Sequence, residues 1–124
     1  MSTDPRRARV RNVTRGTEVA RDIRVASSMR DRTVGLLRTA EADLGDGVFI
    51  EHAPSIHMFF MHYAIDAVFV DGAGRVTRMA PNLRPWQVVW SARGGRDCLE
   101  LPVGRIAESG TQVGDTLETT HTSR

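Results

Sequence analysis

The chain has 124 residues, the size of a single domain, and its 40% hydrophobic and 26% charged residues exclude wholesale disorder, a collagen and a disulfide scaffold. All 17 basic residues are arginine, and the sequence divides into a basic front and an acidic body. Residues 1–38 hold ten arginines against four acids, a net charge of +6, whereas residues 39–124 carry −4. Such asymmetry can indicate an acidic or nucleic-acid partner.

The ends of the chain and its cysteine content bear on location. No apolar run reaches the roughly 18–20 residues that cross a bilayer. The first residues are basic but lack the apolar segment of a secretory signal, so we expect a cytoplasmic protein without membrane association. Cys98 is the only cysteine, which excludes an intrachain disulfide.

The first part of the chain predicts strands followed by a helix. Residues 1–8 are polar and predict a flexible tail. Apolar residues are sparse over 10–26 but alternate at the end, which predicts one or two strands. Residues 28–38 begin with a capping-box-like Ser-Met-Arg-Asp and predict a short helix. Gly45-Asp46-Gly47 then marks a turn before a short buried strand over 48–50.

The remainder is richer in strand signals. Residues 56–62 are too apolar for a strand in solvent, and two alternating runs joined by Asp71-Gly72-Ala73-Gly74 predict a hairpin. Pro102 and Gly110 bound a helix of one or two turns. Further strands are expected over 86–89 and 98–101, a turn and final strand over 113–117, and a second tail over 119–124. The pattern predicts a β-rich α+β domain over 9–118, a curled antiparallel or mixed sheet or small barrel with two short helices.

Six short motifs follow one another in a recognisable order. They are Gly35-Leu36-Leu37, Gly45-x-Gly47, His57-x-x-x-Met61, Ile65-Asp66-x-Val68-Phe69-Val70-Asp71, Leu99-Glu100-Leu101-Pro102-x-Gly104 and Val113-Gly114-Asp115. On these motifs the chain, from about Val19 to Glu118, resembles the bacterial and archaeal family known as domain of unknown function 192. The resemblance implies a mostly β fold with a helix near its N-terminal third, and it implies no reaction.

Polar residues recur inside the apolar strands. Asp66 and Glu100 are flanked by apolar residues, and a carboxylate in such surroundings is paired, hydrogen-bonded or shifted in pKa. The structural interpretation, which we favour, is that each caps a turn or pairs with an arginine such as Arg84 or Arg105. The functional interpretation is that they line a pocket with His57.

The tryptophan after Pro85 completes the candidate site. Trp86 in a proline-bounded loop is either a ligand platform or, as we favour, a lid over a small core. The candidate ligand pocket consists of His57, Met61, Asp66, Arg84, Trp86 and Glu100.

Three other chemistries remain open as alternatives. His57, Met58, Met61 and His62 are soft donors that suit Cu(I), but alternation along a strand would place only two of them on one face. A hydrolase built from Cys98, His57 and Asp66 requires the three to meet in space. Nucleic-acid binding through the arginine-rich N-terminal part is disfavoured, because no aromatic residue precedes Phe49.

The function that these features favour is noncatalytic binding. We expect a small domain that binds an unknown small molecule or protein near His57, Asp66, Trp86 and Glu100, with no cofactor and no metal. The alternative is an enzyme, hydrolase-like or metal-dependent, that uses His57 with a carboxylate. The sequence does not decide whether the protein is an enzyme.

Overall fold

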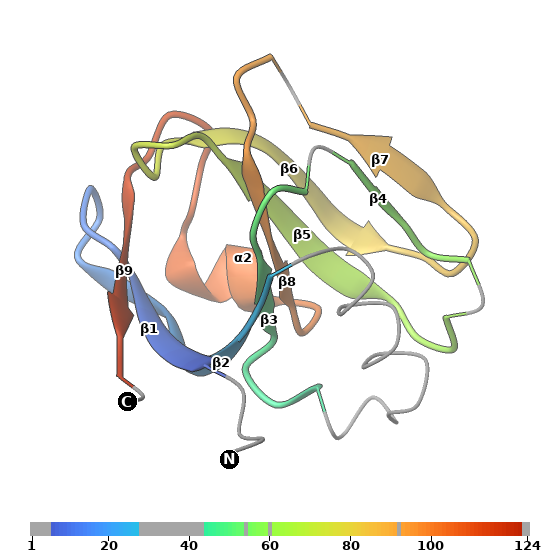
Figure 1. The fold of residues 1–124 in the computed structure, drawn as a ribbon, viewed down its shortest axis with the longest axis horizontal. Coiled ribbons are helices and arrows are strands. Elements are labelled where there is room, and N and C mark those ends of the chain that lie inside the picture. Colours follow the sequence, from blue (N-terminus) through green and yellow to red (C-terminus); the bar gives the residue numbers. More distant parts are fainter. Residues whose placement is uncertain (1–5, 28–43, 54, 60, 92, 123–124) are drawn as a thin grey trace.

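The computed structural model describes residues 6–27, 44–53, 55–59, 61–91 and 93–122, and these residues form two sheets and one α-helix (Figure 1). No helix in this part of the chain is long and apolar enough to cross a membrane. The elements in chain order are β1 Arg6–Asn12, β2 Thr17–Ala26, β3 Val48–Ile50, β4 Ser55–His57, β5 Ile65–Val70, β6 Val76–Leu83, β7 Val88–Trp90, β8 Asp97–Leu101, α2 Arg105–Ser109 and β9 Leu117–His121.

The larger sheet has seven strands in the order β6-β5-β8-β3-β2-β1-β9. Its neighbours pair antiparallel except β2 and β3, which run parallel. A bridge between Arg75 and Thr116 joins the two edges of the sheet at one end, so the sheet curls around an interior (Figure 1). The expected β-rich fold with a curled mixed sheet is confirmed.

Strand alternation explains the basic front of the chain. Along β1 the small or apolar residues Ala8 and Val10 are fully buried, while Arg9 and Arg11 between and after them are exposed. Side chains on a strand alternate between the two faces of its sheet, so the arginines line the outside of the curl. Both β1 and β9 extend into the stretches that we assigned to tails. Strand β1 begins at Arg6 and β9 ends at His121, because the two strands pair with each other in the sheet.

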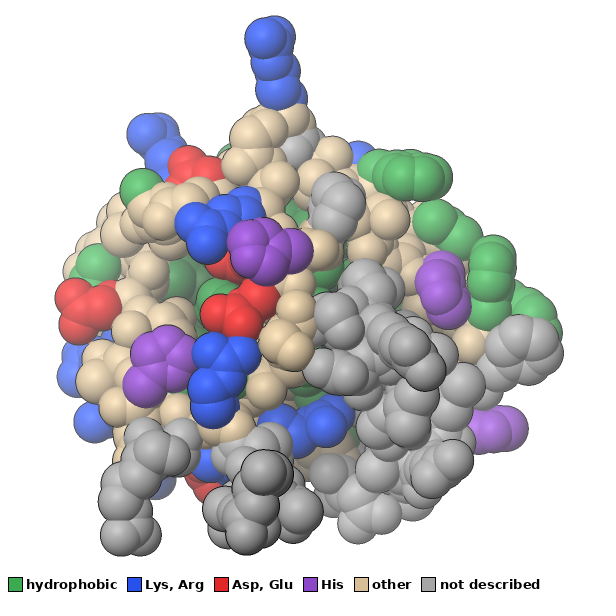
Figure 2. All heavy atoms as spheres, viewed as in Figure 1, with side chains coloured by type: hydrophobic (Ala, Val, Ile, Leu, Met, Phe, Trp, Pro, Cys, Tyr) green, Lys and Arg blue, Asp and Glu red, His purple; other side chains and the backbone are tan. Residues whose placement is uncertain are grey.

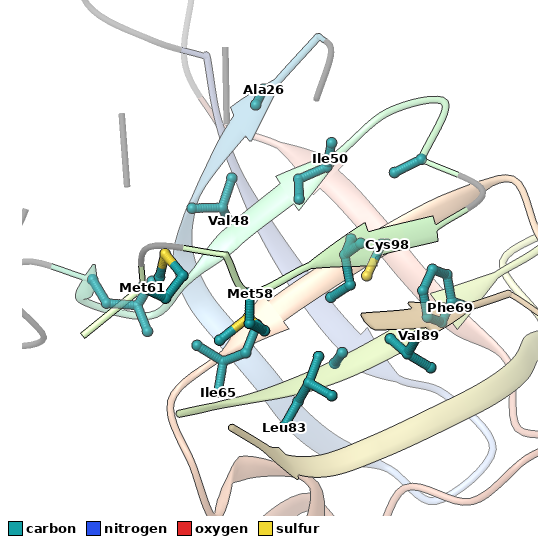
Figure 3. Close-up of a cluster of buried hydrophobic side chains, with 14 of the residues drawn as sticks. Ala26, Val48, Ile50, Met58, Met61, Ile65, Phe69, Leu83, Val89 and Cys98 are labelled. Atoms are coloured by element: carbon teal, nitrogen blue, oxygen red, sulfur yellow. The ribbon is translucent and has the colours of Figure 1, made fainter. Parts of the chain in front are cut away.

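The central strands β3, β5 and β8 are covered on both faces. All six residues of β5 are buried, and its neighbouring side chains belong alternately to two separate apolar clusters. One cluster, the inner core, fills the curl; it includes Val68, Leu99 and, from α2, Ile106. The other, the outer core, lies between the central strands and the small β4–β7 sheet (Figure 3). Its labelled members include Ile50, Phe69, Val89 and Cys98.

The helix expected between Pro102 and Gly110 is confirmed as α2. It stops at Gly110, whose φ of 68° is a left-handed conformation that glycine adopts without strain, and whose N–H caps the last carbonyls. The helix expected over 28–38 lies outside the described residues, so the second of the two expected helices is not confirmed. The strand expected over 86–89 begins two residues later, since residues 84–87 form a turn.

A buried polar network ties the β1–β2 turn to the loop before β9. The side-chain amide of Asn12 donates to Thr111 at 3.1 Å and to Asp115 at 3.0 Å. Arg15 donates to the same carboxylate at 2.7 Å, and the backbone N–H of Gln112 does so at 2.9 Å. Hydrogen bonds from Arg15 and then from Asn12 lower the pKa of Asp115 from 3.8 to about 2, against the opposing effect of burial.

We predict that Asp115 makes stability depend on acid pH. Because its pKa is lower in the folded state, ionised Asp115 stabilises the fold above its ordinary pKa of 3.8, and this stabilisation is lost as the pH falls towards about 2. In urea unfolding at a series of pH values, wild type should be more stable than Asp115→Asn near neutrality, and the difference should shrink towards about pH 2. A difference that stays constant across this range would contradict the assignment.

Candidate functional site

The two-stranded sheet presents one face to the protein and the other to solvent. Ile56 of β4 lies opposite Val89 of β7, and both are buried in the outer core. Their neighbours alternate outward, so His57 pairs with the exposed Val88, and Ser55 pairs with the exposed Trp90. The inner face anchors the sheet and the outer face is left to water.

Large apolar side chains gather on that outer face. The exposed fractions are 40% for Phe59, 60% for Trp86, 45% for Val88 and 67% for Trp90. Together with His57 we call these residues the aromatic face. They expose on the order of 400 Å² of apolar surface, comparable with the largest patch on a typical monomer, which is often functional. Figure 2 shows hydrophobic side chains gathered where Figure 1 draws β4 and β7, with no acidic side chain of the described residues among them.

Three rings of the aromatic face contact one another. The ring centroids of His57 and Phe59 are 4.8 Å apart with 29° between their planes, and those of Phe59 and Trp86 are 5.9 Å apart with 35° between their planes. These separations are typical of interacting aromatic pairs. The side chains of His57, Phe59 and Trp86 therefore form one continuous row of packed rings beside Val88.

Trp86 occupies a backbone position that normally belongs to glycine. Residues 84–87 form a turn in which Gln87 N–H donates to the Arg84 carbonyl at 3.2 Å, Pro85 takes the second position and Trp86 the third, with φ of 70°. This is the pattern of a type II turn, whose third residue requires positive φ. A bulky side chain there costs about 1–2 kcal/mol. Strain of this kind is retained where surrounding contacts impose it, often at functional sites.

The turn is held in place from both sides. Trp86 N–H donates to the Met58 carbonyl at 2.7 Å, and Met58 N–H donates to the Gln87 carbonyl at 2.7 Å. The Gln87 side chain accepts from Arg84 N–H at 2.6 Å. The interpretation of Trp86 as a lid over the core is wrong, because the turn directs the indole to the surface.

Asp66 has a structural task at the start of α2. One carboxylate oxygen accepts from Gly104 N–H at 3.1 Å and from Ile106 N–H at 3.0 Å, and the other accepts from Asn82 N–H at 2.9 Å. The side chain is buried, and these three donors account for its burial. The expectation that Asp66 caps a backbone turn fits this geometry, and no arginine is needed as its partner.

Glu100 and Asp66 point to opposite faces of the sheet. Asp66 alternates with Ala67 on β5 and shares the inner-core face with Val68. Glu100 alternates with Leu99 on β8 and shares the outer-core face with Cys98, fully buried opposite Ala67. The single pocket expected around His57, Asp66 and Glu100 is therefore not formed.

Met61 and the other sulfur donors are core residues. Met58 and Met61 are both buried in the outer core, while His62 is exposed. The expected alternation of donor side chains along a strand over 57–62 is wrong, because β4 ends at His57. After it, Met61 N–H donates a hydrogen bond to the Met58 carbonyl, which forms a turn. Among the described residues no group of three or more His, Cys, Asp or Glu side chains could hold a metal.

The three residues of the hydrolase alternative lie apart in the structure. Cys98 is buried on the outer-core face, Asp66 is bonded at α2 on the other face, and His57 lies on the outward side of β4. A nucleophile, its base and an orienting carboxylate must lie within hydrogen-bond reach of one another. This arrangement does not provide such a constellation.

Most arginines of the basic front that the structure describes pair with acids. Arg7 binds Asp22 at 2.9 Å and Arg9 binds Glu18 at 3.0 Å across β1 and β2. Arg6 reaches Glu51 at 2.6 Å in the acidic body, and this bond lowers the pKa of Glu51. These pairs engage the guanidinium groups of Arg6, Arg7 and Arg9, which argues against a phosphate-binding surface on β1.

Two of the cavities formed by described residues lie away from the aromatic face. One of about 300 Å³ opens beside β9 and is lined by Phe49, Leu99 and Leu117 with Asp71 and Asp97. The other, of about 450 Å³, is lined by charged residues of β2 and α2, including Arg21, Arg105 and Glu108. The six residues of the candidate pocket line neither.

The sequence left three features of the aromatic face unused. Phe59, Val88 and Trp90 were not candidate site residues. A usable signal was the Pro85-Trp86 pair, because a residue after proline in a short turn needs positive φ in the type II form. A second signal is the absence of any acid between Asp71 and Asp97, a stretch with five arginines.

Comparison with known families now identifies the chain. The family model DUF192, described as "Uncharacterized ACR", matches residues 10–119. The chain belongs to the DUF192 family. The resemblance drawn from six short motifs is confirmed, and the matched span begins nine residues before the stretch from Val19 to Glu118 that they indicated.

Curated relatives of this DUF192 protein come from archaea. A UPF0127 protein of Thermococcus sibiricus is 30% identical over 112 residues, covering 86% of this chain and 71% of the relative. A UPF0127 protein of Pyrococcus furiosus is 32% identical over 110 residues, covering 86% of this chain and 94% of the relative. Neither name states an activity.

Two crystal structures share the DUF192 fold. A candidate transcription regulator of Sinorhizobium meliloti superposes with a TM-score of 0.73 at 21% identity, covering 96% of each chain. A protein of unknown function from Novosphingobium aromaticivorans gives a TM-score of 0.67 at 23% identity, covering 90% of this chain and 83% of the other. At these identities the likeness establishes the fold alone.

We predict that Asp66→Asn destabilises the DUF192 domain by about 2–4 kcal/mol, because an amide cannot accept all three buried N–H donors. Asp22→Asn is the matched control: Asp22 is exposed and pairs with Arg7, so its loss should leave the free energy of unfolding nearly unchanged. Urea denaturation of both variants measures the difference. Equal stability of the two variants would show that Asp66 does not hold α2.

Proposed function

We propose that this DUF192 domain is a noncatalytic binding module that docks a protein partner on its aromatic face. The observation that carries the proposal is Trp86, an exposed indole held at positive φ in a turn where glycine would be unstrained. Strain and exposure both oppose stability. A contact made in a complex accounts for an exposed indole that is retained in a strained turn.

The shape of the surface favours a protein over a small molecule. Small ligands bind in concave sites that bury most of their surface, whereas Trp86 and Trp90 are 60% and 67% exposed. Protein interfaces instead use exposed tryptophans as anchors and are enriched in aromatic residues and arginine. The aromatic face has this composition, with Arg84 directly before Pro85.

The structural task of Asp66 separates it from this proposed interface. Of the six residues first considered, His57 and Trp86 lie on the aromatic face, and the exposed Arg84 belongs to the same turn as Trp86. Met61 is buried in the outer core. Cytoplasmic location stays part of the proposal, and the single buried thiol of Cys98 is compatible with a reducing compartment.

The proposal predicts that Trp86→Gly abolishes binding without loss of stability. Glycine relieves the left-handed strain, and its flexibility in the unfolded chain offsets part of that gain, so the free energy of unfolding should stay within about 1 kcal/mol of wild type. A buried lid would lose about 3–5 kcal/mol instead. Thermal and urea unfolding measure this.

Binding is tested with peptides selected on the wild-type protein from a random phage-displayed library. Trp86→Gly should weaken these peptides at least tenfold, a loss of about 1.4 kcal/mol. Val113→Ser is the matched control, because Val113 is 59% exposed and lies in the loop before β9. Failure to select any peptide, or equal binding by both variants, would overturn the proposal.

A further inference from the structure

The chain around the aromatic face carries positive charge and no acid. Residues 72–96, which include β6 and β7, hold five arginines and neither Asp nor Glu. Residues 53–65, which include β4, contain no acid either. The acidic body defined by net charge therefore contains a basic region, and Arg78 and Arg84 of that region lie beside the aromatic face.

One of its arginines, Arg96, pairs with Asp97 at 3.7 Å, but others have no carboxylate partner among the described residues. Among described residues, Arg78, Arg84 and Arg93 form no ion pair, whereas Arg7 and Arg9 on β1 do. The guanidinium of Arg78 donates to the Trp90 carbonyl at 2.9 Å, which places its charge at the edge of β7. Arg84 is exposed in the turn that presents Trp86.

We infer that the partner docked on the aromatic face presents an acidic segment with apolar anchor side chains, an inference that rests on the function proposed above. Guanidinium groups bind carboxylates through paired hydrogen bonds. Val88 and the two indoles supply the apolar contacts, and Arg78 and Arg84 flank them with charge. An extended segment that alternates acidic and apolar residues matches this surface.

Charge and ring packing favour an acidic protein segment over a second copy of the chain and over a single-stranded nucleic acid. A second copy of the chain would bring the unpaired Arg78 and Arg84 of both protomers towards one interface, and like charges there disfavour association. A single-stranded nucleic acid needs free ring faces on which bases stack. His57, Phe59 and Trp86 instead pack against one another at 4.8 and 5.9 Å.

The test compares two synthetic peptides of equal length in which Trp and Leu alternate with Glu in one and with Gln in the other. Fluorescence polarisation with the full chain should give a dissociation constant at least tenfold lower for the Glu peptide. The preference should fall as salt is raised, since exposed charges are screened. Sedimentation of the free chain should give a monomer.

Variants separate the inference from the proposed function. The double variant Arg78→Ser, Arg84→Ser should lose the preference for Glu while still binding the Gln peptide, and Trp86→Gly should lose both peptides. Arg11→Ser, on the outside of β1, is the matched control and should behave as wild type. Unfolding curves for each variant verify that the fold is retained.

Each contrary result has one meaning. Equal affinity for both peptides, with both lost in Trp86→Gly, would overturn the acidic partner and leave the proposed function standing. Full binding by Trp86→Gly would overturn the proposed function itself. Tighter binding to anionic lipid vesicles or to single-stranded DNA than to the Glu peptide, or a dimer abolished by Trp86→Gly, would replace the acidic segment by that occupant.

Discussion

Burial of the central strands on both faces is the constraint from which the remaining architecture follows. β5 has six buried residues in succession, so neither of its faces can be left to water. The curl of the large sheet covers one face and encloses the inner core, which α2 joins through Ile106. The other face requires a second cover, and the β4–β7 sheet provides it with Ile56 and Val89.

That second cover explains why an aromatic surface exists at all. A two-stranded sheet is marginal by itself, so its position depends on the side chains that it buries in the outer core. Once Ile56 and Val89 point inward, alternation sends Val88 and Trp90 outward. The adjoining turn is fixed by hydrogen bonds to Met58, and it adds Trp86 to the same face. A rigid core thus presents a group of exposed rings, which suits recognition by a preformed surface.

The sequence predicted those elements whose signals are local. The β5–β6 hairpin followed from two alternating runs around Asp71-Gly72-Ala73-Gly74, and α2 followed from Pro102 and Gly110. The candidate site was less accessible because it depends on pairing between distant strands. Asp66 and Glu100 look equivalent in sequence, yet the register of β5 with β8 places them on opposite faces.

The solvent exposure of the two tryptophans was the other property that local sequence patterns did not predict. Trp86 and Trp90 look like core residues by type, and only the placement of β7 over the outer core turns them to solvent. The charge of the region was visible in the sequence, but net charge summed over residues 39–124 concealed the acid-free stretch of 72–96. Pairing of the β1 arginines with acids likewise required the structure.

The central claim is that the fold holds its tryptophans at the surface. Trp86 and Trp90 are the only two tryptophans in the chain, so tryptophan fluorescence reports on the aromatic face. The measurement is tryptophan emission and acrylamide quenching of the native protein, compared with the same protein in denaturant. The account predicts a native emission maximum and a quenching constant close to those of the unfolded chain. A blue-shifted native emission that resists quenching would show buried indoles and would contradict it.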